Sequence, residues 1–169
     1  MASIAWRSWP PMTAEIAWPG VSSYEASGVS RAAPDKVWSA WVDVASWSES
    51  EHIDSARLDG EFQPGGIITS KAKGFPRSTL TITRVEPPRV WVDESHSPGV
   101  KMTFEHIIEE GKDGTELTER VLIRGPLARL VGALMRRKLE ALLAVSVAEV
   151  ARRAEQPVGP QPVGSSTLS

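Results

Sequence analysis

Hydrophobic and polar positions alternate through much of the second half of the chain. Residues 79–83 alternate threonine with leucine and isoleucine, and residues 100–110 largely alternate apolar side chains with charged or hydroxyl ones. A period of two places every second side chain on one face of a β-strand. Turn sequences separate these segments, among them Pro-Pro at 87–88 and Asp-Gly at 113–114. The pattern therefore predicts antiparallel strands that follow one another as hairpins.

Two other regions show the spacing of helices. Pro34 and Asp35 suit the first turn of a helix, and apolar residues recur at helical spacing up to residue 42. A break and a second short helical piece follow at residues 43–50. A long helix is predicted to start after Gly125 and Pro126 and to run to about residue 154.

The order of these elements predicts an α+β domain. A strand at residues 24–32 precedes two short helices, five or six antiparallel strands and the long helix. Sequential hairpins form a meander, and a single curved sheet has one apolar face that must be covered. The long helix is the predicted element that can cover it. A helix laid across a curved sheet leaves a cavity between the two.

Composition narrows the possible functions. The chain has 169 residues, of which 41% are hydrophobic and 24% charged, and this suits one globular domain. A formal net charge of -2 argues against non-specific binding of nucleic acid. The absence of cysteine excludes disulfides, cysteine–zinc sites and thiol catalysis. No apolar run approaches the ~20 residues of a membrane span, so we expect no span. Because nucleotide, metal and thiol motifs are absent from the sequence, we also expect no metal or cofactor.

The two ends of the chain differ from the middle. Three of the seven tryptophans lie in the first 18 residues, and we interpret residues 1–23 as a disordered or loosely docked extension. This segment lacks the basic region and long apolar run of a secretory signal, so we expect a cytoplasmic protein. Residues 156–169 are rich in proline, glycine and serine and are interpreted as a flexible tail. Residues 24–155 then form the domain.

Several motifs, taken in order, resemble one known family. They are SRAAPDKVW at residues 30–38, Asp43, Trp47, QPGG at 63–66, VEPPR at 85–89 and GPL at 125–127 ahead of a basic helix. Over residues 24–155 the chain resembles the START-like, or helix-grip, superfamily, and within it the polyketide cyclase/dehydrase and lipid transport branch.

The resemblance implies a definite fold and a class of ligand. In the helix-grip fold a curved antiparallel sheet of six to seven strands wraps around a long C-terminal helix, with two short helices after the first strand. Members hold lipids, steroids, hormones or polyketides in a deep apolar pocket, and some are cyclases. No invariant catalytic set spans the superfamily, so the fold alone does not fix the function.

His106 and Glu119 are the candidate catalytic residues. Each shares the parity of the apolar positions in its strand, so both would point into the cavity from adjacent strands. Such a pair in a dry pocket can move a proton in an aldol-type cyclisation or a dehydration. The alternative is that the two side chains pair with each other or with water as satisfied buried polar groups. No third ligand for a metal is evident.

The strand at residues 90–96 has two possible inner faces. Either Trp91 and Asp93 point inward, or Glu94 and His96 do.

In the long helix, Leu134 and Lys138 fall on an apolar stripe that runs from residue 127 to residue 145. Lys138 could therefore enter the pocket or extend its ammonium group out at the mouth. The expected ligand-binding residues are Trp47, Trp91, Asp93, Glu94, Phe104, Val121, Leu134 and Lys138.

Three functions remain open at this point. The leading one is binding of a small hydrophobic or aromatic molecule, lipid-like or polyketide-like, in the cavity. The second is a cofactor-free cyclase, aromatase or dehydratase that uses His106 with Glu119 or Asp93. The third is a protein-interaction module that acts through the tryptophans of residues 1–23. The expected partner is a small hydrophobic molecule, and the protein is expected to be a monomer or a homodimer.

Overall fold

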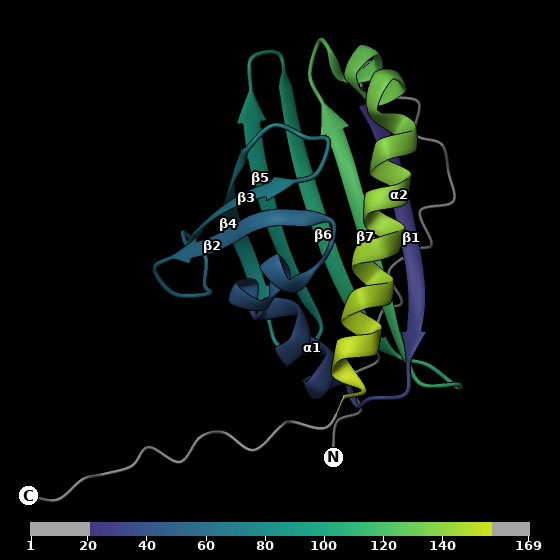
Figure 1. Cartoon of the computed structure of the whole chain (residues 1–169). Helices are drawn as coiled ribbons and strands as arrows, with labels where there is room; N and C mark the ends of the chain where they lie inside the picture. The colour runs from purple at the N-terminus through teal and green to yellow at the C-terminus, as the bar shows by residue number, and fades with distance from the viewer. Residues whose placement is uncertain (1–20, 157–169) are drawn as a thin grey trace, which may run out of the picture.

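The computed structural model describes residues 21–156 (Figure 1). The elements in chain order are β1 Val21–Ser30, α1 Pro34–Val42, the 3-10 helix η1 Val44–Glu49, β2 Ile53–Asp59, β3 Ile67–Ala72, β4 Ser78–Glu86, β5 Val90–Ser97, β6 Val100–Glu110, β7 Thr115–Arg124 and α2 Ala128–Ala154. Residues 21–23, assigned above to the extension, are the first residues of β1. The other predictions for the extension and the tail lie outside the described residues.

All seven strands form one antiparallel sheet in the order β1-β7-β6-β5-β4-β3-β2. Strands β2 to β7 are a meander, and β1 pairs with β7 at the edge. Figure 1 shows α2 lying along β7 and β1, with α1 near the C-terminal end of α2. The predicted α+β helix-grip fold, with a curved sheet of six to seven strands, is confirmed.

Glycines allow α2 to approach β1 closely. A Cβ atom on Gly132 of α2 would lie 2.6 Å from the hydroxyl oxygen of Ser22, and one on Gly28 of β1 would lie 2.7 Å from a methyl of Val147. Neither distance is compatible with a side chain, so both contacts depend on glycine. Because α2 packs mainly on β1 and β7, the inner faces of β3 to β6 are left only partly covered. The cavity of the protein lies there.

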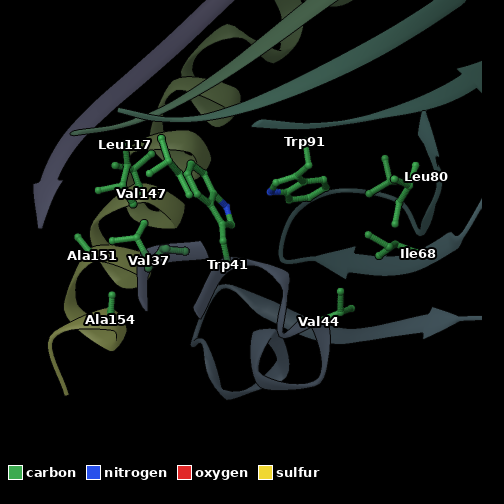
Figure 2. Packing of buried hydrophobic residues seen from close by; sticks show 13 residues of the cluster. Val37, Trp41, Val44, Ile68, Leu80, Trp91, Leu117, Val147, Ala151 and Ala154 are labelled. Carbon is green, nitrogen blue, oxygen red and sulfur yellow. The ribbon is translucent and has the colours of Figure 1, made fainter. Parts of the chain in front are cut away.

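A cluster of buried aromatic and aliphatic side chains fills the end of the molecule where α1 meets α2. Figure 2 shows Trp41 and Trp91 facing one another, with Val147 and Leu117 on one side and Leu80 and Ile68 on the other. Trp41, from the first short helix, is 2% exposed. This cluster closes one end of the space between the sheet and α2.

The structure resolves the ambiguity in β5. Trp91 and Asp93 are buried on the inner face, whereas Glu94 and His96 point to the outer face. Glu94 there forms an ion pair with Lys101 at 2.8 Å. Parity alone could not decide this, because Val90 and Val92 make the outer face apolar as well.

The apolar stripe predicted for α2 differs from its buried side, although four of its residues, Leu127, Val131, Leu142 and Val145, line the cavity. The buried residues include Gly132, Leu139, Leu143 and Val147, whereas Leu134 is 81% exposed. At 100° per residue, the centre of this buried set lies about 150° around the helix from the centre of the predicted stripe. Apolar residues surround most of this helix, and buried glycine and alanine carry little of the signal from which its phase was predicted.

Candidate functional site

A cavity of about 330 Å³ lies between α2 and the inner face of the sheet. Its wall is mainly apolar, with side chains from β4, β6 and α2. The apolar lining includes Leu80, Met102, Phe104, Leu139 and Leu142. Ligand pockets in proteins commonly measure ~300–1,000 Å³ and are lined in this way, so the space suits a small organic molecule.

Three ionisable side chains lie together on the inner wall of the cavity. Asp93 on β5, His106 on β6 and Glu119 on β7 come from neighbouring strands and are 1%, 4% and 7% exposed. The strand register places His106 directly opposite Glu119, and the two side chains approach to 3.5 Å between Nε2 and Oε1. We call these three residues the acid–histidine cluster. The predicted meeting of His106 and Glu119 therefore occurs, with Asp93 beside them.

Burial changes the acidity of Asp93. Removal from water raises the pKa of Asp93 from 3.8 to about 7, and the nearby carboxylate of Glu119 adds to this, although His106 opposes it. At neutral pH a substantial fraction of this carboxyl group is therefore protonated. It can donate a proton or a hydrogen bond, which an ordinary aspartate cannot do at that pH.

Each member of the acid–histidine cluster keeps one polar atom without a partner. Within residues 21–156, Oδ1 of Asp93, Nδ1 of His106 and Oε2 of Glu119 have no hydrogen-bond partner. A buried polar atom without a partner costs about 1–3 kcal/mol. The cluster is thus not a closed network of satisfied groups, and a molecule in the cavity with hydroxyl or carbonyl groups can complete it.

Two tryptophans fix the imidazole of His106. Trp91 stacks on it with a centroid distance of 3.5 Å and an interplanar angle of 1°. Trp41 meets the same ring edge-on at 5.2 Å and 89°. Trp91 is fully buried behind the ring and does not itself line the cavity. The histidine is therefore held in one orientation by packing.

The structure places the predicted site residues in three groups. His106, Glu119, Asp93, Trp47 and Phe104 line the cavity. Trp91 and Val121 are buried beside it without reaching its wall. The remaining three, Glu94, Leu134 and Lys138, do not line it.

Different physical causes remove those three from the cavity. Glu94 lies on the outer face of β5, as described above. Leu134 lies on the exposed side of α2. At 100° per residue, Lys138 falls between the cavity residues Leu127 and Val131, but its side chain is exposed. The ammonium group of Lys138 instead donates to the backbone oxygen of Gly74 at 3.2 Å. This contact links α2 to the turn between β3 and β4.

Arg153 is a cavity residue that the sequence patterns did not indicate. It lies in the last turn of α2, lines the cavity and hydrogen-bonds the hydroxyl of Ser46 in η1. Within residues 21–156 its Nε is buried without a hydrogen-bond partner, and burial lowers the pKa of its guanidinium group. At 100° per residue, Arg153 falls in line with Met135, another cavity residue. The correct phase of the helix is the signal that would have found it.

No metal centre or membrane-crossing helix is visible in the part of the chain that the structure describes. Among residues 21–156, no group of three or more His, Asp or Glu side chains is arranged to hold a metal ion. No helix within these residues is both long and apolar enough to cross a membrane.

A curved antiparallel sheet, a long C-terminal helix and an apolar cavity between them define a helix-grip domain. The sequence profile of the polyketide cyclase/dehydrase and lipid transport family matches residues 21–155, and the chain belongs to this family. The resemblance found in the sequence motifs is therefore confirmed. Among curated proteins, none has a sequence that matches this chain.

Solved structures with the same fold have very different sequences. The di-domain ARO/CYC BexL from the BE-7585A biosynthetic pathway is 16% identical, with a TM-score of 0.66 over 82% of this chain and 51% of that chain. This chain thus spans about half the length of that protein. Ara h 8.0201 is 18% identical with a TM-score of 0.59, covering 79% of this chain and 99% of that chain.

A third solved structure is that of truncated norcoclaurine synthase from Thalictrum flavum. It is 10% identical, with a TM-score of 0.64 over 81% of this chain and 96% of that chain. At these identities the three structures are evidence for the fold alone.

Proposed function

We propose that this protein binds a small, mainly apolar or aromatic molecule in the cavity between α2 and the sheet. The observation that carries the proposal is the cavity of about 330 Å³, with its apolar walls and the unpaired polar atoms of the acid–histidine cluster. The walls provide non-directional affinity, and the cluster recognises hydroxyl or carbonyl groups on one edge of the ligand. Membership of a family of cyclases and lipid carriers supports this reading.

A titration with a neutral aromatic probe tests the binding proposal. N-phenylnaphthylamine should bind with a stoichiometry of one in native mass spectrometry, with a rise in fluorescence. Ser95 lines the cavity from β5, and Ser95→Phe should fill the space and remove the binding. Thr83→Phe, on the exposed face of β4, is the matched control and should bind as the wild type does. Unchanged binding by Ser95→Phe, or no binding by the wild type, would overturn the proposal.

The same cluster supports a second candidate function, a cofactor-free cyclase or dehydratase. The specific observation is that a carboxyl group with a pKa of about 7 lies beside a histidine–carboxylate pair. One group of the pair can remove a proton from the carbon next to a carbonyl group of the ligand. In a cyclisation, the resulting carbanion attacks a second carbonyl carbon of the ligand, and protonated Asp93 gives its proton to the oxygen of that carbonyl as the carbon–carbon bond forms. In a dehydration, Asp93 protonates a hydroxyl group that leaves as water while a carbon–carbon double bond forms. Both steps leave the total number of protons unchanged and need no redox partner.

His106→Asn tests the catalytic role separately from binding. Because asparagine cannot transfer protons in this way, turnover of a poly-β-carbonyl substrate should fall by about 100-fold or more. Affinity for N-phenylnaphthylamine should change little, since that probe makes mainly apolar contacts. If the variant keeps full turnover, His106 is not the acid–base group. If binding and turnover are lost together with the fold, the residue is structural.

A further inference from the structure

Three leucines project from the N-terminal half of α2. Leu127, Leu130 and Leu134 are 44%, 67% and 81% exposed. Single exposed leucines are common on protein surfaces, but three within two helical turns form a contiguous apolar patch. Leu127 also lines the cavity, together with Val131 and Met135 of the same helix. The patch therefore lies at the edge of the cavity.

Two basic residues border this patch along the helix. At 100° per residue, the three leucines cover an arc of about 60°, and Arg137 and Lys138 lie about 20° beyond its two ends. Both side chains are exposed. We call Leu127, Leu130, Leu134, Arg137 and Lys138 the leucine–basic face. Apolar side chains in the centre with cations along the borders are the arrangement of helices that lie in a membrane interface.

Positive charge predominates around this face, although the whole chain has a net charge of -2. No acidic residue occurs between Arg120 and Glu140 in the sequence. Across the cavity, the turn between β3 and β4 contributes exposed Lys73 and Arg77, and none of residues 62–85 is acidic. The hydrogen bond from Lys138 to Gly74 brings the turn and the helix together. Basic side chains therefore outnumber acidic ones at this edge of the cavity, where Asp54 of β2 pairs with Lys71 and also lies near Lys73.

We propose that the leucine–basic face docks on an anionic lipid surface. Leucines that protrude from a convex helix can enter a fluid hydrocarbon layer without a complementary groove, whereas a protein partner would need one. The flanking cations would remain at the level of the phosphate groups. The edge of the cavity would then face the lipid, so that an apolar molecule could pass between lipid and cavity. The docking itself does not depend on whether the cavity binds or transforms its ligand.

Co-sedimentation with vesicles tests the docking. The full chain should bind vesicles of phosphatidylcholine and phosphatidylserine at least about tenfold more tightly than vesicles of phosphatidylcholine alone, and salt should weaken the binding. Arg137→Gln combined with Lys138→Gln should lower the affinity by about 30-fold, since each basic residue near such a surface contributes about fivefold. Leu130→Ser combined with Leu134→Ser should lower it by at least about tenfold. The unfolding temperatures of both variants should match that of the wild type.

Matched controls lie elsewhere on the surface. Val29 on β1 is 52% exposed, and Arg152 is an exposed residue in the last turn of α2. Val29→Ser and Arg152→Gln should bind vesicles as the wild type does. Equal losses in the controls, or no binding of folded wild type to phosphatidylserine vesicles, would overturn the proposal.

Two further outcomes would assign the face to another partner and so also overturn the lipid proposal. The first is binding to polyglutamate without binding to vesicles, which indicates an acidic protein. The second is a dimer in solution that the leucine substitutions convert to a monomer. Uptake of N-phenylnaphthylamine is measured without lipid, so failure of the docking is distinguishable from failure of the proposed ligand binding.

Discussion

At the scale of single residues, the candidate site combines features that sequence reasoning can and cannot reach. The alternation of apolar residues along β6 and β7 is enough to predict that His106 and Glu119 meet, because the register between these two strands is regular. Parity left Asp93 undecided, since both faces of β5 carry apolar side chains. The stacking of Trp91 on His106 follows from cross-strand register, which no local pattern reveals.

Asp93 should make the stability of the protein depend on pH. Its pKa is about 7 in the folded protein against 3.8 for the free side chain, so the folded state binds more protons between these values. Folding is therefore favoured by this group below pH 3.8, and that contribution is lost as pH rises through about 7. Asp93→Asn removes the charge that folding must bury. At pH 8 it should raise the free energy of unfolding relative to wild type by on the order of a few kcal/mol.

Urea unfolding of wild type and Asp93→Asn at pH 5 and pH 8 measures this difference. The gain in stability should be clearly larger at pH 8. Asp35→Asn, at the exposed start of α1, is the control and should show a similar difference at both pH values. An equal effect of Asp93→Asn at the two pH values would mean that Asp93 is not protonated on folding.

Trp91 offers a second prediction at this scale. Trp91→Leu keeps an apolar side chain but removes the ring that stacks on His106. The variant should lose about 2–4 kcal/mol of stability through the cavity it leaves. It should also lower the kcat for a cyclisation substrate more than it raises KM, because the imidazole loses its fixed orientation. Val121, on β7, is fully buried and makes no ring contact with His106, so Val121→Ala should cost stability without that kinetic effect.

At the scale of elements, the strands were predictable and the phase of α2 was not. A strand has only two faces, so the apolar parity of β6 and β7 identified the inner face directly. A helix can be rotated continuously, and α2 has apolar residues around most of its circumference. Its packing side is decided by Gly28 and Gly132, where the lack of a side chain allows close approach. Small residues contribute little to a hydrophobic pattern, so the predicted phase of α2 missed the cavity residue Arg153. The ammonium group of Lys138 stays out of the cavity for another reason, because it reaches Gly74 instead.

Gly132→Ala tests whether these glycines seat the helix. An added Cβ would lie 2.7 Å from the Cβ of Ser22, which cannot move without shifting β1. The strain should outweigh the roughly 1 kcal/mol that alanine adds to an isolated helix, leaving a net loss of about 1–2 kcal/mol. Combining it with Ser22→Gly should restore most of that loss in a double-mutant cycle, measured by urea unfolding. Additive effects of the two substitutions would contradict the close contact.

At the scale of the whole molecule, the position of α2 determines both the cavity and the surface beside it. Because the helix lies close to β1 and β7, the opposite part of the curved sheet keeps an open inner face. The cavity follows from this offset, and so does the exposure of the leucines along the cavity edge. The fold class could be predicted from the order of elements, whereas the position of α2 close to β1 and β7 is seen only in the structure.

Ligand occupancy should stabilise the whole fold through the cavity. A molecule that binds only the folded state at 100 times its Kd raises the free energy of unfolding by about 2.7 kcal/mol. N-phenylnaphthylamine at that excess should therefore raise the Tm of the wild type by several degrees in a calorimetric scan. Leu130→Ser combined with Leu134→Ser should show the same shift, because those leucines point away from the cavity. Ser95→Phe should show none, since its aromatic ring occupies the space that the probe would fill. A shift that survives in Ser95→Phe would place the probe on the outer surface, and the cavity would then have no part in the stabilisation.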